Sequence, residues 1–368
     1  MEKMVLILAL LFILAGCSTV LSADDTAKAN ITSKREKAAQ LLIVGFKNKQ
    51  EIIEAIKEYK VGGVILFASN IDNRAHVKEL IRQLQEVSMA VTGAPLMVCI
   101  DQEGGRVDRL AGTDAMPFSK KNIEWGALYE KDEKKAMEGI YTQAVSTADA
   151  LKSMGFNINF APVLDVCDID NNALFVTSGR SYGSDPEAVS RLGSHYIRVL
   201  QDNGVCATAK HFPGHGSTVA DTHLGFSEDP SSMEKIEKNH LAPFRAAVEA
   251  QVDCIMVSHV TYKAIDPDLP ATLSPAISKG LLRDRLGYRG MIVSDSMTMD
   301  AIHANYGKEA YSMCINSGID TMIIAHPQKK DIEDAVEEIA ANVSDERLDE
   351  ALYQVTKLKK GFLKKMKK

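Results

Sequence analysis

Short apolar segments recur along this 368-residue chain and alternate with longer segments in which apolar residues repeat at helical spacing. The apolar segments, rich in β-branched residues, are Leu41–Phe46, Val61–Phe67, Leu96–Ile100, Ile158–Val163, Val205–Ala209, Cys254–Val257, Met291–Val293 and Thr321–Ile324. The segments of helical spacing are Val77–Met89, Glu133–Met154, Pro186–Asn203, Met233–Ala250, Pro275–Leu286 and Lys330–Asn342. Eight strands that alternate with helices predict an α/β fold, a single (β/α)8 barrel of the TIM type.

A doubly wound open sheet is the alternative fold for such an alternation. It is disfavoured because no GxGxxG segment follows an early strand. A last helix is expected from Asp345 to about Lys365, so the barrel ends in C-terminal helices.

The N-terminus has the pattern of an export signal. An apolar run from Met4 to Ala15 is too short to span a bilayer, and it leads into Leu14-Ala15-Gly16-Cys17. These four residues resemble a bacterial lipoprotein signal, in which the cysteine becomes the acylated N-terminus. A transmembrane anchor and an ordinary secretory signal are the alternatives.

The expected organisation is therefore a lipoprotein signal peptide over residues 1–16, a tether over 17–34 and the barrel domain over 35–368. Lipid on Cys17 would hold the protein at the extracytoplasmic side of a membrane.

Charge and composition narrow the choice of ligand. The chain has 43 basic and 49 acidic residues, a net charge of −6, so nucleic acid is not an expected partner. The sequence has no CxxC and no histidine–cysteine spacing typical of a zinc site. We expect no metal, no cofactor and no obligate protein partner.

Polar residues gather at the carboxyl ends of five of the expected strands. In a TIM barrel these ends form one rim, where catalytic residues are found, so the recurrence predicts an active site there. The groups are Asp101-Gln102-Glu103-Gly104-Gly105-Arg106, then Asp165, Lys210 with His211, Ser258 with His259, and Ser294-Asp295-Ser296-Met297.

Two of these segments suggest particular chemistry. Asp295 follows an apolar strand between small hydroxyl residues, where a carboxylate stays ionised in one rotamer, which suits a nucleophile; an N-cap is the alternative role. Asp221 precedes His223 by two residues on a glycine-rich loop, so the carboxylate can orient the imidazole as a general acid/base. The alternative is that such a loop carboxylate caps a backbone turn.

Several segments together resemble the signature blocks of family 3 glycoside hydrolases, and among these the bacterial β-N-acetylglucosaminidase branch. The resemblance runs from about Lys37 to Ala340, and the Lys210–Gly216 block is its most specific part. The blocks are Asp101-Gln102-Glu103-Gly104-Gly105-Arg106-Val107, Phe160-Ala161-Pro162-Val163-Leu164-Asp165-Val166, Gly179-Arg180-Ser181-Tyr182-Gly183, Lys210-His211-Phe212-Pro213-Gly214-His215-Gly216 and Ser294-Asp295-Ser296-Met297.

The resemblance implies a retaining exo-hydrolase of terminal β-linked N-acetylglucosamine, with peptidoglycan fragments as the expected source. It implies that Asp295 forms the glycosyl-enzyme, that His223 is the acid/base and that Asp221 is its partner. It also implies that the sugar hydroxyls are bound by Asp101, Arg180, Lys210 and His211.

Two other functions remain open at this point. A histidine acid/base, unlike a carboxylate, would not repel an incoming phosphate, which is compatible with a phosphorylase. A catalytically silent sugar-binding lipoprotein is the second, although intact Asp221, His223 and Asp295 speak against it. The segments Leu224–Pro230 and Cys167–Thr177 differ from the family pattern, so the leaving-group preference is not carried over.

Overall fold

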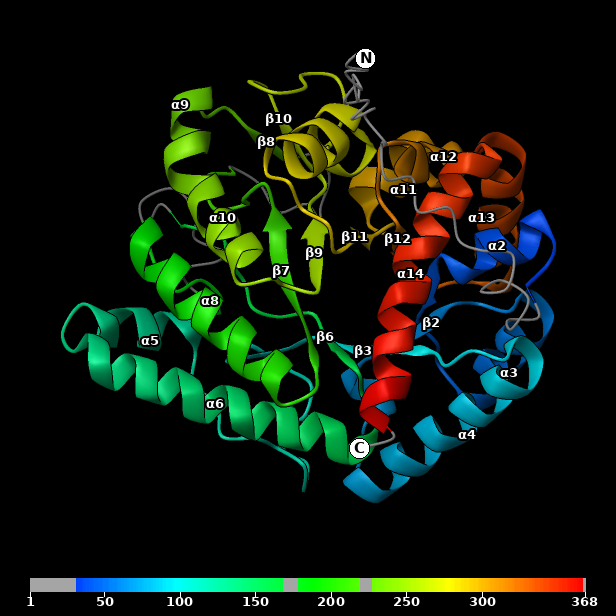
Figure 1. Cartoon of the computed structure of the whole chain (residues 1–368), viewed down its shortest axis with the longest axis horizontal. Helices are drawn as coiled ribbons and strands as arrows, with labels where there is room; N and C mark the ends of the chain where they lie inside the picture. The colour runs from blue at the N-terminus through cyan, green and yellow to red at the C-terminus, as the bar shows by residue number, and fades with distance from the viewer. Residues whose placement is uncertain (1–30, 168–177, 219–226, 367–368) are drawn as a thin grey trace, which may run out of the picture.

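Eight parallel strands close into a barrel in the computed structural model of the chain, with helices around it (Figure 1). The structure describes residues 31–167, 178–218 and 227–366. The barrel strands follow one another around the ring in chain order. They are β1 (Leu42–Val44), β2 (Gly63–Leu66), β3 (Met97–Ile100), β6 (Ile158–Asn159), β7 (Cys206–Phe212), β9 (Cys254–Val257), β11 (Met291–Ser296) and β12 (Thr321–Ile324).

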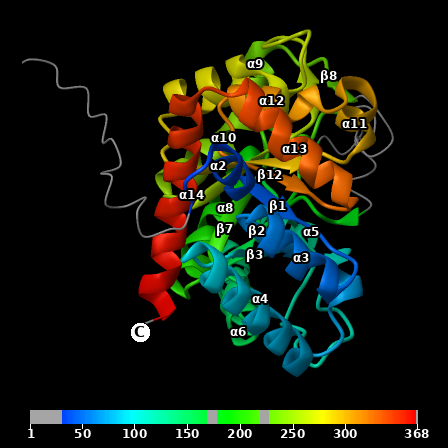
Figure 2. The same ribbon diagram turned by 90° about the vertical axis from the view of Figure 1, so that its right-hand side faces the viewer.

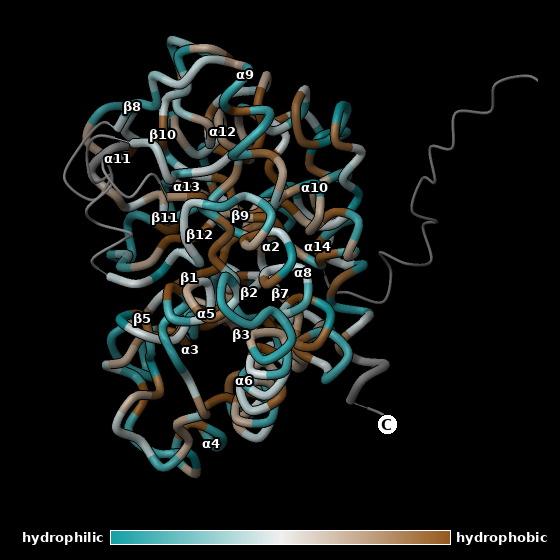
Figure 3. The backbone as a smooth tube through the Cα atoms, turned by 90° about the vertical axis from the view of Figure 1, so that its left-hand side faces the viewer, coloured by the Kyte–Doolittle hydropathy of each residue, from teal (hydrophilic) through white to brown (hydrophobic). Residues whose placement is uncertain are grey.

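The predicted (β/α)8 fold is therefore confirmed, and each of the eight apolar segments overlaps one barrel strand. Strands such as β3 and β9 are buried along their whole length because side chains fill the barrel on one face and helices cover the other. Figure 3 shows the hydrophobic stretches along the strands and the hydrophilic ones toward the outside.

Helices form the outer layer, and each predicted helical segment is found in it. In Figure 1, α6 and α8 lie along one side of the barrel, and α8 packs against both α6 and α10. Figure 2 shows the other side, where α2 contacts α13 and α14. The helices are α2 (Lys34–Gln40), α3 (Lys49–Tyr59), α4 (Arg74–Thr92), α5 (Asn122–Tyr129), α6 (Glu133–Met154), α8 (Pro186–Asp202), α9 (Met233–Lys235), α10 (Leu241–Glu249), α11 (Asp300–Tyr306), α12 (Glu309–Asn316), α13 (Lys329–Asn342) and α14 (Asp345–Met366).

Short polar side chains begin several of these helices. Asn48, Asn73 and Asp132 each accept a hydrogen bond from a backbone N–H of the first turn, which would otherwise lack a partner. Ser33 forms a capping box with Glu36 at the start of α2. Helix α2 thus begins at Lys34, the last residue of the segment that we expected to be a tether.

Two helical segments differ from a regular α-helix. The predicted helix Met233–Ala250 contains a π-helical stretch, η2 (Ile236–His240), between α9 and α10. The predicted helix Pro275–Leu286 is π-helical over η4 (Ala276–Arg285). Two 3-10 turns are also present, η1 (Ala68–Asn70) and η3 (Ala271–Leu273).

Two small sheets extend the carboxyl rim of the barrel. Strands β4 (Gln102–Gly104) and β5 (Val107–Asp108) form an antiparallel pair directly after β3. Strands β8 (Ser227–Asp229) and β10 (Val260–Tyr262) pair in parallel beyond β7 and β9. Among the described helices none is long and apolar enough to cross a membrane.

Candidate active site

A cavity of about 780 Å³ opens at the carboxyl ends of the barrel strands. The residues for which we expected contact with the substrate meet on its wall, although they come from four different parts of the chain. These residues are Asp101, Arg180, Lys210, His211 and Asp295.

Three other predicted functional residues lie outside the described residues. Asp221 and His223 belong to the segment 219–226, and Cys17 belongs to the segment 1–30. The acid/base dyad and the lipid anchor therefore stay predictions from the sequence.

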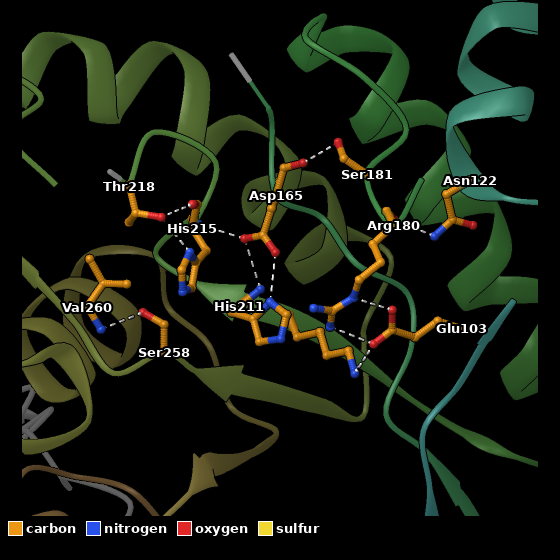
Figure 4. A network of polar contacts seen from close by, with 12 residues as sticks. Glu103, Asn122, Asp165, Arg180, Ser181, His211, His215, Thr218, Ser258 and Val260 are labelled. Carbon is orange, nitrogen blue, oxygen red and sulfur yellow. Dashed lines mark hydrogen bonds and ion pairs between the residues drawn. The ribbon is translucent and has the colours of Figure 1, made fainter. Parts of the chain in front are cut away.

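Glu103 organises the cations on one side of the cavity, and sequence reasoning did not single it out. Arg180 donates two hydrogen bonds to the Glu103 carboxylate, each of 2.8 Å, in a bidentate arrangement. The Lys210 ammonium group lies 2.6 Å from Glu103 Oε1 and 2.7 Å from Asp101 Oδ1. Figure 4 shows the Arg180 and Glu103 side chains facing one another.

The charges of this cluster stabilise one another. Burial would raise the pKa of the Glu103 carboxyl, but Arg180 and Lys210 outweigh it and hold that pKa well below its ordinary value. Burial would also lower the pKa of Lys210, yet Asp101 and Glu103 raise it. The cluster presents fixed charged hydrogen-bonding groups to the cavity, which suits a substrate rich in hydroxyl groups.

Asp165 binds the end of β7 and the loop that follows it. Its Oδ1 accepts hydrogen bonds from the backbone N–H of His211 at 3.1 Å and of His215 at 2.7 Å. Its Oδ2 lies 2.7 Å from His211 Nδ1, so the ring of His211 is held in one orientation (Figure 4). Burial would raise the pKa of Asp165, and the two histidines lower it.

The glycine at the end of the Lys210–Gly216 block is required by a close approach of two chain segments. A Cβ atom on Gly216 would lie 1.7 Å from the carbonyl oxygen of Val166, in the segment that carries Asp165. The specific spacing of this block therefore has a structural basis, since it lets the loop lie against the Asp165 segment.

Asp295, the predicted nucleophile, lies at the end of β11 with its carboxylate oriented by its own backbone. The N–H of Ser296 donates a 2.7 Å hydrogen bond to Asp295 Oδ1. Burial would raise the pKa of Asp295, but His259, His211 and this N–H lower it to about 2. The carboxylate is thus ionised at neutral pH, as a nucleophile must be.

His215, another residue of the cavity wall, is neutral at physiological pH. Its Nδ1 lies 2.8 Å from the hydroxyl of Thr218. Burial lowers the pKa of His215 to about 4. This histidine therefore offers hydrogen bonds without adding a charge near Asp295.

Apolar and aromatic groups complete the cavity. Ile65, Met256 and Ile323 reach it from β2, β9 and β12. At the wall, the Phe67 and His326 rings lie 4.7 Å apart, and the Arg109 guanidinium lies 5.7 Å from the Phe67 ring. Apolar surface beside charged donors is typical of sites that bind a sugar ring by its faces and its hydroxyls together.

The residues that the structure describes contain no cluster of side chains suited to bind a metal ion. Within residues 31–167, 178–218 and 227–366, no group of three or more histidine, cysteine, aspartate or glutamate side chains is arranged to hold a metal ion.

Some site residues could have been found from sequence and others not. Glu103 and Asp165 both belong to the motif blocks named above, and a polar residue shortly after a predicted strand is also the signal that pointed to Asp101 and Asp295. What the sequence did not show is that they bind protein side chains, because their partners lie far along the chain, 77 residues away for Glu103 and Arg180.

The fold and the cavity are those of a TIM-barrel enzyme with an ionised carboxylate and clustered cations at its carboxyl rim. The family described as glycosyl hydrolase family 3, N-terminal domain, matches residues 33–358. The chain therefore belongs to glycosyl hydrolase family 3, and it is a glycoside hydrolase with β-hexosaminidases among its relatives.

Individual relatives agree with this membership. A β-hexosaminidase of Stenotrophomonas maltophilia (strain K279a) is 34% identical over 274 residues, which cover 74% of this chain and 78% of the relative. A family 3 β-N-acetylglucosaminidase from Paenibacillus sp. has a similar structure, with a TM-score of 0.83 and 34% identity. The match covers 90% of this chain and 63% of the Paenibacillus protein.

A third relative is close to this chain in length. The β-N-acetylhexosaminidase from Beutenbergia cavernae matches with a TM-score of 0.80 and 27% identity, over 89% of this chain and 99% of that protein. Nearly the whole of the Beutenbergia protein thus corresponds to the barrel of this chain.

Proposed function

We propose that this protein is a retaining exo-β-N-acetylglucosaminidase that removes terminal β-linked N-acetylglucosamine. The observation that carries the proposal is the position of Asp295 on a cavity wall that also holds Asp101, Arg180, Lys210 and His211. The names of the relatives, β-hexosaminidase and β-N-acetylglucosaminidase, support the choice of sugar.

The reaction would proceed in two steps. The ionised carboxylate of Asp295 attacks the anomeric carbon, and the glycosidic oxygen leaves with a proton from His223. His223 then takes a proton from water, and the water oxygen displaces Asp295 from the sugar. Asp221 would orient His223 and stabilise its charged form.

Side chains of the cavity wall would hold the sugar in place for this attack. Lys210, Arg180 and His211 are each fixed by a buried or half-buried carboxylate, so the donors lose little conformational freedom when the substrate binds. A site with preset donors positions the anomeric carbon over the nucleophile.

Cell location and natural substrate are further parts of the proposal. The Leu14-Ala15-Gly16-Cys17 segment supports acylation of Cys17 and attachment to the extracytoplasmic side of a membrane. Fragments of peptidoglycan, which contain β-linked N-acetylglucosamine, would be the substrate at that place.

Hydrolysis of two chromogenic sugars tests the proposal. We expect the aryl β-N-acetylglucosaminide to be cleaved and the aryl β-glucoside to be cleaved at least about a hundredfold more slowly, as kcat/KM. Equal rates would contradict the N-acetylglucosamine assignment. Release of sugar phosphate in phosphate buffer, in place of free sugar, would identify a phosphorylase.

A further inference from the structure

His259 follows β9 and is buried beside the proposed nucleophile, with 1% of its surface exposed. Its Nε2 lies 2.8 Å from the carbonyl oxygen of Ser296, the residue next to Asp295. Its Nδ1 lies 2.6 Å from the hydroxyl oxygen of Thr272. Both ring nitrogens of His259 therefore form hydrogen bonds with oxygen atoms. These oxygen atoms determine which of the two nitrogens carries a proton.

The carbonyl oxygen of Ser296 carries no proton, so the hydrogen bond at Nε2 requires a proton on that nitrogen. The Thr272 hydroxyl has a single proton, and it is used at 2.6 Å on the carbonyl oxygen of Ser258, which also carries none. Thr272 must then accept, not donate, at His259, so Nδ1 carries a proton as well. A histidine with a proton on both nitrogens is an imidazolium cation.

We propose that His259 is a buried imidazolium that positions Asp295 and keeps its carboxylate ionised. The inference rests on the proposed function, in which Asp295 is the nucleophile. His259 acts through Ser296: its Nε2 binds the Ser296 carbonyl, and the Ser296 N–H binds Asp295 Oδ1. It is thus a positioning residue and does not touch the sugar.

The charge of His259 acts on the same carboxylate. Among the groups that favour the charged form of Asp295, His259 has the largest effect, ahead of His211 and Lys210, which reach it from β7. His211 and Lys210 are themselves bound to the carboxylates of Asp165 and Asp101. His215, in the loop after β7, is affected by the charge of Asp295 in turn.

A cation at this place also suits the second chemical step. When water attacks the glycosyl-enzyme, the carboxylate of Asp295 leaves with a full negative charge, and a fixed positive charge nearby stabilises it. Burial of His259 strengthens this interaction because little water screens it.

The protonation state of His259 can be measured without any assay of activity. We expect nitrogen-15 NMR of the histidine-labelled full chain to show both ring nitrogens of His259 protonated from about pH 5 to about pH 8. Its signal is assigned by its loss in His259→Gln or, should that variant not fold, by its shift in Thr272→Ser. A neutral ring with one bare nitrogen at about pH 7 would overturn the proposal.

The pH profile of catalysis tests the effect on Asp295. In His259→Gln we expect the acidic limb of kcat/KM to move up by about one pH unit or more. Thr272→Val, which removes the acceptor for Nδ1, should move it in the same direction and further than Thr272→Ser. His195→Gln, on the outer helix α8, is the control and should keep the wild-type profile.

An unchanged acidic limb in both His259→Gln and Thr272→Val would refute the positioning role. Failure of the proposed function gives a different result, since a wild-type protein that cleaves no glycoside still reports the charge of His259 by NMR.

Discussion

Glu103 Oε1 lies 2.6 Å from the Lys210 ammonium nitrogen and accepts a 2.8 Å hydrogen bond from Arg180, so one buried oxygen joins two cations of the cavity wall. Lys210 follows Glu103 by more than a hundred positions in the sequence. This relationship makes Glu103 the residue on which the geometry of the proposed sugar contacts depends.

Replacement of Glu103 by glutamine should weaken both substrate binding and folding. The amide keeps the shape but removes the buried negative charge that Arg180 and Lys210 share, while Asp101 stays paired with Lys210. We expect KM to rise about tenfold or more, and the free energy of unfolding to fall by about 3 kcal/mol. Steady-state kinetics and denaturant unfolding measure these two quantities.

Glu79→Gln is the matched control because Glu79 pairs with Arg82 on the surface of α4. It should leave KM and the unfolding midpoint as they are in the wild type. A Glu103→Gln variant with wild-type KM would show that the cluster does not position the substrate.

His215 should make the stability of the protein depend on pH in the weakly acidic range. Its pKa in the folded state is lowered from 6.5 to about 4, so the unfolded chain binds its proton first as the pH falls. Stability from this residue is complete above about pH 6.5 and is lost on acidification toward about pH 4, by up to about 3 kcal/mol.

Denaturant unfolding at several pH values measures this loss, and His215→Gln should reduce the slope between about pH 6.5 and pH 4. The control is His76→Gln, at an exposed position of α4, for which we expect the wild-type slope. The same slope in His215→Gln and in the wild type would contradict a buried, neutral His215.

Lys359 should destabilise the protein at neutral pH. It is 4% exposed, and its Nζ donates a 2.8 Å hydrogen bond to Gln40 Oε1. Burial lowers the pKa of Lys359 from 10.5 to about 7, so the unfolded chain holds this proton more tightly than the folded chain. The free energy of unfolding should therefore rise as the pH increases from about 7 toward about 10.

Lys359→Met should increase the free energy of unfolding at about pH 7 by about 1–3 kcal/mol, and it should abolish most of this rise with pH. The gain is limited because Gln40 Oε1 loses the hydrogen bond from Lys359. Unfolding curves of the variant and the wild type at about pH 7 and about pH 9 measure both the gain in stability and its rise with pH. A less stable variant that keeps the rise would mean that Lys359 stays charged and is well paired.

The fold could be predicted because each parallel strand, buried on both faces, has an apolar sequence. The prediction was less accurate where polar residues continue a strand. We expected the fifth strand to end at Ala209, but β7 runs on to Phe212 through Lys210 and His211. These two polar residues can be buried in a strand because Glu103 and Asp165 bind them, which no local pattern reveals.

The fourth strand shows the opposite difference. The apolar segment Ile158–Val163 predicted a longer strand than β6, which ends at Asn159. Pro162 has no N–H to donate, so beyond β6 the pairing with β7 is reduced to an isolated bridge between Val163 and Lys210.

The candidate site could be predicted in part for a related reason. Residues at the carboxyl end of a strand, such as Asp101 after β3 and Asp295 near the end of β11, are placed at the rim by the fold alone. The role of His259 depends on the proton of Thr272 and on the backbone of Ser296, and these contacts exist only in three dimensions.

The covalent intermediate on Asp295 is the central claim, and mass spectrometry of the trapped enzyme tests it most directly. A 5-fluoro N-acetylglucosaminide with an activated leaving group slows the second step more than the first, so the glycosyl-enzyme accumulates. We predict that the peptide containing Asp295 gains the mass of one fluorosugar, and that Asp295→Asn gains none. A label on any other residue, or an unlabelled wild-type enzyme that still turns over the substrate, would contradict the account.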